Sequence, residues 1–363
     1  MRRILHCHST FDAGGKEARA VRLMNAFGDQ FDHVILTATP GALGARTLID
    51  PGVRADFPTD APSLIGKPGP RRYHRLADYM RGFDLILTYN WGAMDAVMAH
   101  RVFDNLPPLI HHEDGFNADE AVRLKTRRNF FRRLALPTAR ALVVPSQTLE
   151  AVARGVWHIT PVRIANGIDV AAYARPTVAI PGLARLPGEI VVGTLAGLRP
   201  VKNLLRLVRA AATIPNVRLV IVGEGPERAA ILAEAARTGM ADRLVLPGFM
   251  PRPHDYIGHF DLFALSSDSE QFPISLIEAM AAGLPCLATD VGDVATIVAT
   301  ANRHFVMPAE DRAFAAGLAA LCGDAAIRRL LGEANRAKAL AEYDERIMIG
   351  RYRMLYEAAF RDS

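Results

Sequence analysis

The alternation of short apolar runs with longer amphipathic segments is the feature of this sequence that most constrains its fold. Short apolar runs are typical of strands buried in a parallel sheet, and amphipathic stretches between them are typical of crossover helices. Strands are predicted within 2–9, 33–39, 83–90, 107–114, 141–146 and 161–167, with helices beginning near Gly15, Trp91, Glu120 and Gln147. This repeated βαβ order is the pattern of a doubly wound α/β sheet.

The same pattern starts again after a segment rich in proline and glycine, residues 174–189. Strands are predicted within 190–197, 217–225, 243–249, 261–267 and 285–290, and helices within 203–213, 226–238 and 274–282. The sequence therefore predicts two doubly wound, Rossmann-like domains facing a cleft. The predicted limits are 1–172 for the N-terminal domain, 173–186 for the linker and 187–344 for the C-terminal domain. Ligands bind such sheets beyond the carboxyl ends of the strands, so functional residues are expected directly after predicted strands.

Composition narrows the class of protein. The chain has 363 residues, of which 50% are hydrophobic, which is enough for two packed cores. No window offers about 18 uninterrupted apolar residues, and the first residues lack a signal-peptide cleavage site, so we expect a cytoplasmic protein. The cysteines, Cys7, Cys286 and Cys322, are odd in number and far apart, which predicts packing residues rather than disulfides or a zinc site.

Positive charge is concentrated in the first half of the chain. Residues 1–180 contain 23 Lys and Arg against 17 Asp and Glu, whereas the remainder contains 20 against 21. The densest basic segment is 123–140, in which Arg127, Arg128, Arg132 and Arg133 surround two phenylalanines. At helical spacing, the 123–133 portion could lie on an anionic membrane surface on the inner face of the cell membrane or receive an acidic acceptor, or it could form a solvated helix face. No recognised nucleic-acid-binding module accompanies it, so nucleic acid is not the expected partner.

The stretch 269–290 places Glu270 and Glu278 on either side of a helix start. Asp268 or Ser269 can cap this helix, Pro273 suits its first turn, and Gly283 suits its end. Free amides at a helix start favour an anion such as a diphosphate, and two carboxylates beside it could accept hydrogen bonds from a ribose and a sugar ring. The motif is therefore interpreted as a nucleotide-sugar-binding motif. The alternative is that Glu278 is a partly buried acid paired with a lysine or arginine.

In this stretch the sequence resembles the E-x7-E region of retaining glycosyltransferases with the GT-B fold, the large family 4 of glycosyltransferase group 1. The resemblance extends over most of the chain. Its further segments are FDAGGKEARAVRLMNAFG, LVVPSQTLEAVA, IANGIDVAAY, GTLAGLRPVKNLLRLVRA, LVIVGEGPER and GFMPRPHDYIGHFDLFALSS.

The resemblance implies roles for individual residues. Glu278 would hydrogen-bond the ribose, Glu270 would hold the transferred sugar with the backbone around Phe272, Pro273 and Ile274, and Lys202 would neutralise the diphosphate. Gly14 and Gly15 would let a loop approach the donor or the acceptor, and Gly197 and Gly223 lie in the donor-binding turns. A fixed cation stabilises a departing nucleoside diphosphate without a metal, so no metal and no cofactor beyond the donor substrate are expected.

Two positions depart from the family pattern. The family usually has arginine where this chain has Gly197, and Arg199, three residues before Lys202, is the expected substitute. The family histidine after the strand at 107–114 matches either His112 or Asp114, depending on the register. His111 and His112 should point to opposite faces of that strand, so only one can face a ligand. The adjacent spacing of these residues suits no recognised metal site.

The expected activity is retaining, metal-independent transfer of a hexose from a UDP or GDP sugar to a hydroxyl of a glycan or lipid-linked acceptor in cell-surface polysaccharide synthesis. The basic segment at 123–133 and the predicted loop at 63–75 suggest that the acceptor is a lipid-linked or anionic glycan intermediate. A nucleotide-sugar epimerase of related fold and a noncatalytic nucleotide-sugar-binding protein remain alternatives. An NAD enzyme is a weaker candidate, because GEGPER lacks the third glycine of the dinucleotide fingerprint. The final helix, about 345–360, should pack back onto the first domain, as in relatives.

Overall fold

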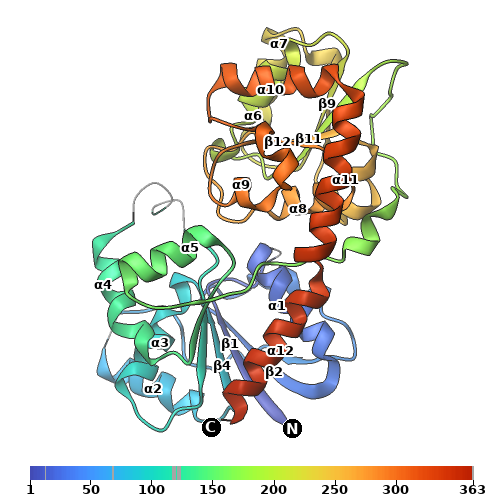
Figure 1. The fold of residues 1–363 in the computed structure, drawn as a ribbon. Coiled ribbons are helices and arrows are strands. Elements are labelled where there is room, and N and C mark those ends of the chain that lie inside the picture. The colour runs from blue at the N-terminus through green and yellow to red at the C-terminus, as the bar shows by residue number, and fades with distance from the viewer. Residues whose placement is uncertain (13, 68, 117–119, 121–123, 362–363) are drawn as a thin grey trace. The chain divides into compact units, whose positions relative to one another are not determined.

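A computed structural model describes residues 1–12, 14–67, 69–116, 120 and 124–361. The chain divides into two compact units, and each is described by itself (Figure 1). Unit 1 comprises Met1–Asn166 and Met348–Ser363, and unit 2 comprises Gly167–Ile347. The domain limits predicted from the sequence, 1–172 and 187–344 with a linker between them, stay a prediction.

Unit 1 is built on a seven-stranded sheet in the order β3-β2-β1-β4-β5-β6-β7, and all of its paired strands run parallel. The order reverses between β1 and β4, because the chain winds outward from β1 first in one direction and then in the other. The strands are β1 Arg2–His8, β2 Phe31–Thr37, β3 Arg54–Asp56, β4 Leu85–Tyr89, β5 Leu109–His112, β6 Ala141–Val144 and β7 Val162–Arg163.

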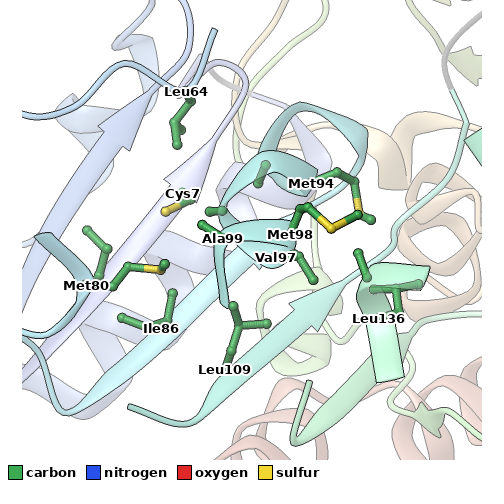
Figure 2. Packing of buried hydrophobic residues seen from close by; sticks show 14 of the residues in the cluster. Cys7, Leu64, Met80, Ile86, Met94, Val97, Met98, Ala99, Leu109 and Leu136 are labelled. Atoms are coloured by element: carbon green, nitrogen blue, oxygen red, sulfur yellow. The ribbon is translucent and has the colours of Figure 1, made fainter. Parts of the chain in front are cut away.

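Helices cover both faces of this sheet (Figure 1). One face packs against α2 Pro70–Met80, α3 Met94–Val102, α4 Thr126–Ala135 and α5 Gln147–Val152. Figure 2 shows this core, in which Met94, Val97 and Met98 of α3 lie close to Leu109 of β5 and Leu136. The other face packs against α1 Gly15–Phe27 and the last helix, α12 Glu345–Arg361. The alternation within β1 explains this division, because Cys7 belongs to the first core while His6 and His8 point to the opposite face.

Unit 2 contains a six-stranded parallel sheet in the order β10-β9-β8-β11-β12-β13, which reverses between β8 and β11. Its strands are β8 Ile190–Leu195, β9 Val217–Val222, β10 Leu244–Gly248, β11 Leu262–Leu265, β12 Cys286–Thr289 and β13 Val306–Met307. Its helices are α6 Leu204–Ala212, α7 Arg228–Arg237, α8 Ile274–Ala281, α9 Val294–Ile297, α10 Asp311–Gly323 and α11 Ala325–Glu342. α6, α7 and α10 bury their apolar residues in one cluster against β8, β9 and β11.

These two sheets confirm the predicted doubly wound α/β class. Four elements differ from the sequence prediction in the following ways. The predicted loop at 63–75 is wrong over its second half, because Pro70 begins helix α2, where its missing N–H costs no hydrogen bond. The helix expected to begin near Glu120 begins at Thr126. The short strands β3 and β13 were not predicted, since two or three residues carry no periodicity.

A stack of buried aromatic rings lies on the α12 side of the unit 1 sheet. The ring of Tyr89 lies 3.9 Å from that of His8 and 4.6 Å from that of His112, and Tyr352 of α12 follows at 5.8 Å from His112. His6 hydrogen-bonds His33 at 3.0 Å between ring nitrogens. The burial lowers the pKa of His6, His8 and His112 well below the usual value and lowers the pKa of His33 to about 4.

We expect unit 1 to lose stability as the pH falls below the ordinary histidine pKa. Each of these histidines is neutral in the folded chain at a pH at which the unfolded chain takes up a proton. The free energy of unfolding should therefore be constant above about pH 7 and fall between about pH 6.5 and 4, by up to about 1.4 kcal/mol per pH unit for each histidine. Urea unfolding of the chain followed by the fluorescence of its two tryptophans, Trp91 and Trp157, reports on unit 1.

The matched pair for this measurement is His33→Gln and His304→Gln. His33 is buried and His304 is exposed. The buried substitution should flatten the pH dependence and the exposed one should leave it unchanged. An unfolding free energy that stays constant from pH 7 to pH 5 would contradict the prediction.

Candidate active site

The loops that follow β8 and β11 meet where the strand order of unit 2 reverses. Ligands of doubly wound sheets bind at such a reversal. A 3-10 turn over Pro200–Lys202 follows β8, and residues 266–273 connect β11 to α8. Lys202 and Glu270, which the sequence places 68 positions apart, come together here.

Lys202 and Glu270 form a partly buried ion pair. The Nζ atom of Lys202 lies 2.5 Å from Oε1 of Glu270, and these side chains are 16% and 10% exposed. The hydroxyl of Ser267 donates to the same carboxylate oxygen at 2.7 Å, and the hydroxyl of Ser266 donates to the backbone carbonyl of Lys202 at 3.0 Å. The two β11-side serines thus fix both members of the pair. The ammonium group of Lys202 has three donors, so it can bind a phosphate oxygen while it still pairs with Glu270.

Helix α8 begins directly after this pair. Its N-cap is Pro273, which provides no side-chain cap, so the prediction that Asp268 or Ser269 caps the helix is wrong. The carboxylate of Asp268 instead accepts from the side-chain amide of Asn203 at 3.1 Å and pairs with Arg206 at 2.9 Å. A helix start without a side-chain cap leaves first-turn amides for an anionic ligand. Pro273 and Ile274 lie at this helix start, and their contact with a donor stays a prediction.

Glu278 lies one turn into α8 and accepts a hydrogen bond from Tyr173. The Tyr173 hydroxyl lies 3.1 Å from Oε1 of Glu278. Burial, and then the charge of Glu278, raise the pKa of the neighbouring Tyr256. Tyr173 could not be linked to Glu278 from the sequence, because it lies 105 residues earlier in the chain. A tyrosine hydroxyl is thus one partner of this carboxylate and helps to hold it in place.

Close backbone approaches shape the same loops. Gly292 has φ of +55°, and a Cβ atom there would lie 2.2 Å from the carbonyl oxygen of Glu270. Gly223 has φ of +146°, and a Cβ atom would lie 1.9 Å from the carbonyl oxygen of Ala196. The amide of Gly223 donates to the carbonyl of Gly248 at 2.9 Å. Gly223 therefore joins two loops, and Gly292 sets the position of the Glu270 backbone.

Arg199 lies over Gly197. A Cβ atom built on Gly197 would be 3.5 Å from Nε of Arg199, and both residues are exposed. The Arg199 side chain thus lies in the space that a side chain at position 197 would otherwise enter. The expectation that Arg199 replaces the arginine that the family resemblance places at position 197 stays a prediction.

At the carboxyl edge of the unit 1 sheet, Asp114 pairs with Arg19 of α1. One Arg19 nitrogen, Nη2, lies 2.9 Å from Oδ2 of Asp114, and Nη1 also contacts Asp114 and donates to Asn166 at 3.1 Å. Burial, the largest single influence, lowers the pKa of Arg19, but the charge of Asp114, its hydrogen bond and two neighbouring tyrosines together raise that pKa above the usual value, so the guanidinium stays charged. The Asp114 amide donates to the Asn90 side chain at 2.7 Å. Arg19 was not predicted as a site residue, although an arginine among buried helix positions requires a carboxylate partner.

The two candidates for the family histidine lie in different surroundings. His112 is 1% exposed and its ring lies between those of Tyr89 and Tyr352. His111 hydrogen-bonds the Thr88 hydroxyl on the other face of the strand, so the predicted opposite orientation of the two histidines is confirmed. Asp114, with a side chain 13% exposed, lies beyond the strand end.

The glycine-rich loop before α1 is held by local contacts. Gly15 is the first residue of the helix, and a Cβ atom on Gly14 would lie 2.7 Å from a carboxylate oxygen of Glu17. Lys16 pairs with this buried glutamate. The absence of a side chain at Gly14 therefore makes space for the carboxylate of Glu17.

The basic segment is divided between the interior and the surface. Arg132 is fully buried: its Nε lies 3.1 Å from Glu113, its Nη1 lies 3.3 Å from Glu120, and Trp91, Phe116 and Trp157 surround it. The interpretation of Arg132 as part of a membrane-facing or solvated surface is therefore wrong. Its charge is used inside unit 1 to balance two buried carboxylates.

Among the residues that the structure describes, no three histidine, cysteine or acidic side chains gather in a way that could hold a metal ion. None of the helices that these residues form has both the length and the apolarity needed to cross a membrane. The cysteines are free and buried, which confirms that they are packing residues.

Comparisons with known proteins agree with these observations. Residues 181–338 match the family Glycosyl transferases group 1, and residues 13–172 match Glycosyltransferase Family 4. EpsF of Bacillus subtilis, described as a glycosyltransferase, is 26% identical over 315 residues, which are 80% of this chain and 79% of EpsF. The N-acetyl-alpha-D-glucosaminyl L-malate synthase of Bacillus anthracis is 28% identical over 48% of this chain, and the match spans only 47% of that enzyme.

The solved structure of HepE from Anabaena in complex with UDP has a TM-score of 0.79 to this chain at 20% identity, covering 98% of this chain and 100% of HepE. This likeness and the two doubly wound sheets confirm the predicted GT-B fold class of two Rossmann-like α/β domains.

Proposed function

Because the chain belongs to the glycosyltransferases of group 1 and family 4, we propose that it transfers a hexose from a UDP sugar to a hydroxyl acceptor with retention of anomeric configuration. The observation that carries this proposal is the Lys202–Glu270 pair beside the uncapped start of α8, at the sheet reversal of unit 2. UDP is favoured over GDP because HepE was solved with UDP and also with UDP-glucose.

Different residues of unit 2 would bind different parts of the donor. Glu278, held by Tyr173, would accept hydrogen bonds from the ribose hydroxyls. The first amides of α8, Lys202 and Arg199 would face the diphosphate. Glu270 would contact the hydroxyls of the sugar, since an ionised carboxylate accepts strong hydrogen bonds. In this arrangement carboxylates face hydroxyl groups and cations face the phosphates, as the chemistry of each side chain requires.

The chemical step follows from the placement of charge. As the anomeric carbon–oxygen bond breaks, negative charge grows on the departing diphosphate, and Lys202 with the helix amides would stabilise it without a metal. The acceptor hydroxyl would attack from the face that the diphosphate leaves, and its proton would pass to a diphosphate oxygen. An NMR spectrum of the product would test retention, since an inverted anomeric linkage excludes this course.

The acceptor is proposed to bind at the carboxyl edge of the unit 1 sheet. Arg19 and Asp114 lie at this edge, and of the two family-histidine candidates we propose Asp114, because His112 is enclosed by aromatic rings. We further propose a role in cell-surface polysaccharide synthesis with peripheral attachment to an anionic membrane. The exposed members of the basic segment, Arg127 and Arg133, support that attachment together with the exposed side chain of Phe130.

Donor binding is tested by replacing Glu278. The substitution Glu278→Gln should weaken UDP-glucose binding about 10- to 100-fold, because hydrogen bonds to a charged group contribute about 1.5–3 kcal/mol. Tyr173→Phe should have a smaller effect of a few fold, since it removes only the group that positions the carboxylate. Isothermal titration calorimetry with UDP and UDP-glucose provides both values.

The matched control is Glu333→Gln, which makes the same change on an exposed position of α11. Unchanged affinity in Glu278→Gln would show that this carboxylate does not contact the donor. If the wild-type protein binds UDP-glucose and releases no sugar to any hydroxyl or water, the noncatalytic alternative is correct instead.

A further inference from the structure

A pocket that the proposed donor chemistry does not use lies in unit 1 between the start of α3 and α4. Its volume is about 330 Å³. It is lined by Trp91, Gly92, Met94, Asp95, Arg127, Arg128 and Phe131. Trp91 directly follows Asn90, whose side chain accepts from the amide of Asp114, so the pocket adjoins the carboxyl edge proposed for the acceptor.

The interior of this α3–α4 pocket is apolar. The rings of Trp91 and Phe131 meet edge to face with centroids 5.6 Å apart, and Met94 is buried beside them. The carboxylate of Asp95 is already occupied, because Arg72 pairs with it and the hydroxyl of Tyr73 donates to it at 3.3 Å. A sugar ring would find few partners here for its hydroxyls, whereas a hydrocarbon chain needs none.

The mouth of the pocket is positively charged. The guanidinium of Arg128 lies 4.9 Å from the Trp91 ring centroid and pairs with Glu120 at 2.8 Å. Arg127 is exposed, and within the described part of the chain no acidic side chain pairs with it. Arg127 therefore provides a positive charge that a phosphate at the mouth of the pocket could neutralise.

The outer face of α4 continues this surface. Phe130 and Leu134, one helical turn apart, are 68% and 48% exposed, and Arg127 and Arg133 lie beside them on the same helix. An exposed apolar pair flanked by arginines is suited to the interface of an anionic membrane.

We propose that the α3–α4 pocket binds the hydrocarbon chain of an amphiphilic acceptor in which that chain is joined to a phosphate, and that Arg127 contacts the phosphate. This inference rests on the proposed glycosyl transfer and names the class of its acceptor. The chain anchors the acceptor, and the phosphate at the mouth fixes how far it enters. The hydroxyl to be glycosylated is then held on the far side of the phosphate from the chain.

The dependence of affinity on chain length tests this proposal. Butyl, hexyl and octyl phosphate, used as monomers, are titrated calorimetrically into the full chain without donor. The Kd should fall about fourfold for each added methylene until the pocket is full, as expected for transfer of a CH₂ group out of water. Inorganic phosphate should bind far more weakly than octyl phosphate. Equal affinity for all of these ligands would overturn the proposal.

Two arginine variants localise the binding. Arg127→Glu should weaken octyl phosphate binding at least tenfold, whereas Arg101→Glu, the same change on an exposed position of α3, should leave it unchanged. Both variants are first checked for unaltered thermal unfolding. Equal binding in the two variants would place the phosphate elsewhere and would contradict the assignment of Arg127.

UDP binding measured in the same samples separates this proposal from the proposed function. If UDP binds and the alkyl phosphates show no chain-length dependence, the acceptor class is wrong and glycosyl transfer stands. If the alkyl phosphates bind as expected and no UDP sugar binds, the pocket is a lipid-phosphate site and the proposed transfer is wrong.

Discussion

Replacing Lys202 by methionine is expected to lower kcat for sugar transfer by about 10²- to 10³-fold, a loss of about 3–4 kcal/mol of transition-state stabilisation. The methionine side chain has a similar length but no charge to offset the departing diphosphate. KM for the nucleotide sugar should rise less than kcat falls, because the negative charge on the leaving group grows as the bond breaks. Initial rates at several donor concentrations separate the two parameters.

The ion pair with Glu270 provides an internal check on this expectation. Lys202→Met leaves Glu270 partly buried without its partner, so the double variant with Glu270→Gln should lose less activity than the two single losses combined. Lys202→Arg keeps the charge and should retain more activity than Lys202→Met. Arg329→Met, on an exposed position of α11, is the control for loss of a positive charge in unit 2. A kcat for Lys202→Met within threefold of wild type would exclude Lys202 from the chemical step.

Replacing Arg132 by methionine is expected to destabilise the protein by about 3–5 kcal/mol, because Glu113 and Glu120 would lose the buried cation that pairs with both. Arg127→Ser, five residues earlier on the exposed side of the same helix, should change stability by less than about 0.5 kcal/mol. Urea unfolding monitored by tryptophan fluorescence reports the difference directly, since Trp91 and Trp157 both contact Arg132.

This pair of variants also decides how membrane binding should be tested. A quadruple replacement of Arg127, Arg128, Arg132 and Arg133 would remove a core residue together with surface charges, so loss of liposome binding would follow from unfolding alone. Replacement of Arg127 and Arg133 only leaves the core intact. Equal stability of Arg132→Met and wild type would show that the two glutamates are neutralised by another route.

The order of apolar runs along the sequence predicts the fold, and the residues that follow these runs predict the donor loops. Both predictions depend on features that are local in sequence. Short apolar runs mark the strands, and the residues that follow β8 and β11 must lie at one edge of the sheet. The sequence could not predict that Lys202 contacts Glu270 or that Tyr173 contacts Glu278, since each contact joins distant segments.

Arg132 is a residue whose burial could not be predicted from the sequence. The basic segment repeats arginine at helical spacing, so its members look equivalent, yet only the surroundings provided by distant residues distinguish them. Trp157 and Glu113 come from other elements and enclose Arg132, whereas Arg127 remains exposed. Helix α2 was missed for a related reason: Pro70 was interpreted as a loop residue, although proline is also favoured in the first turn of a helix.

Helix α12 has a consequence for how the protein is made. Met348, Tyr352, Tyr356 and Phe360 complete one of the two cores of unit 1, but the ribosome synthesises them after the whole of unit 2. During translation, the apolar surface that α12 will cover on α1 and β2 is therefore exposed while unit 2 already has all its strands. Unit 1 thus begins to form before unit 2 and is completed after it, and a ribosome-stalled chain ending before residue 348 should depend on chaperones.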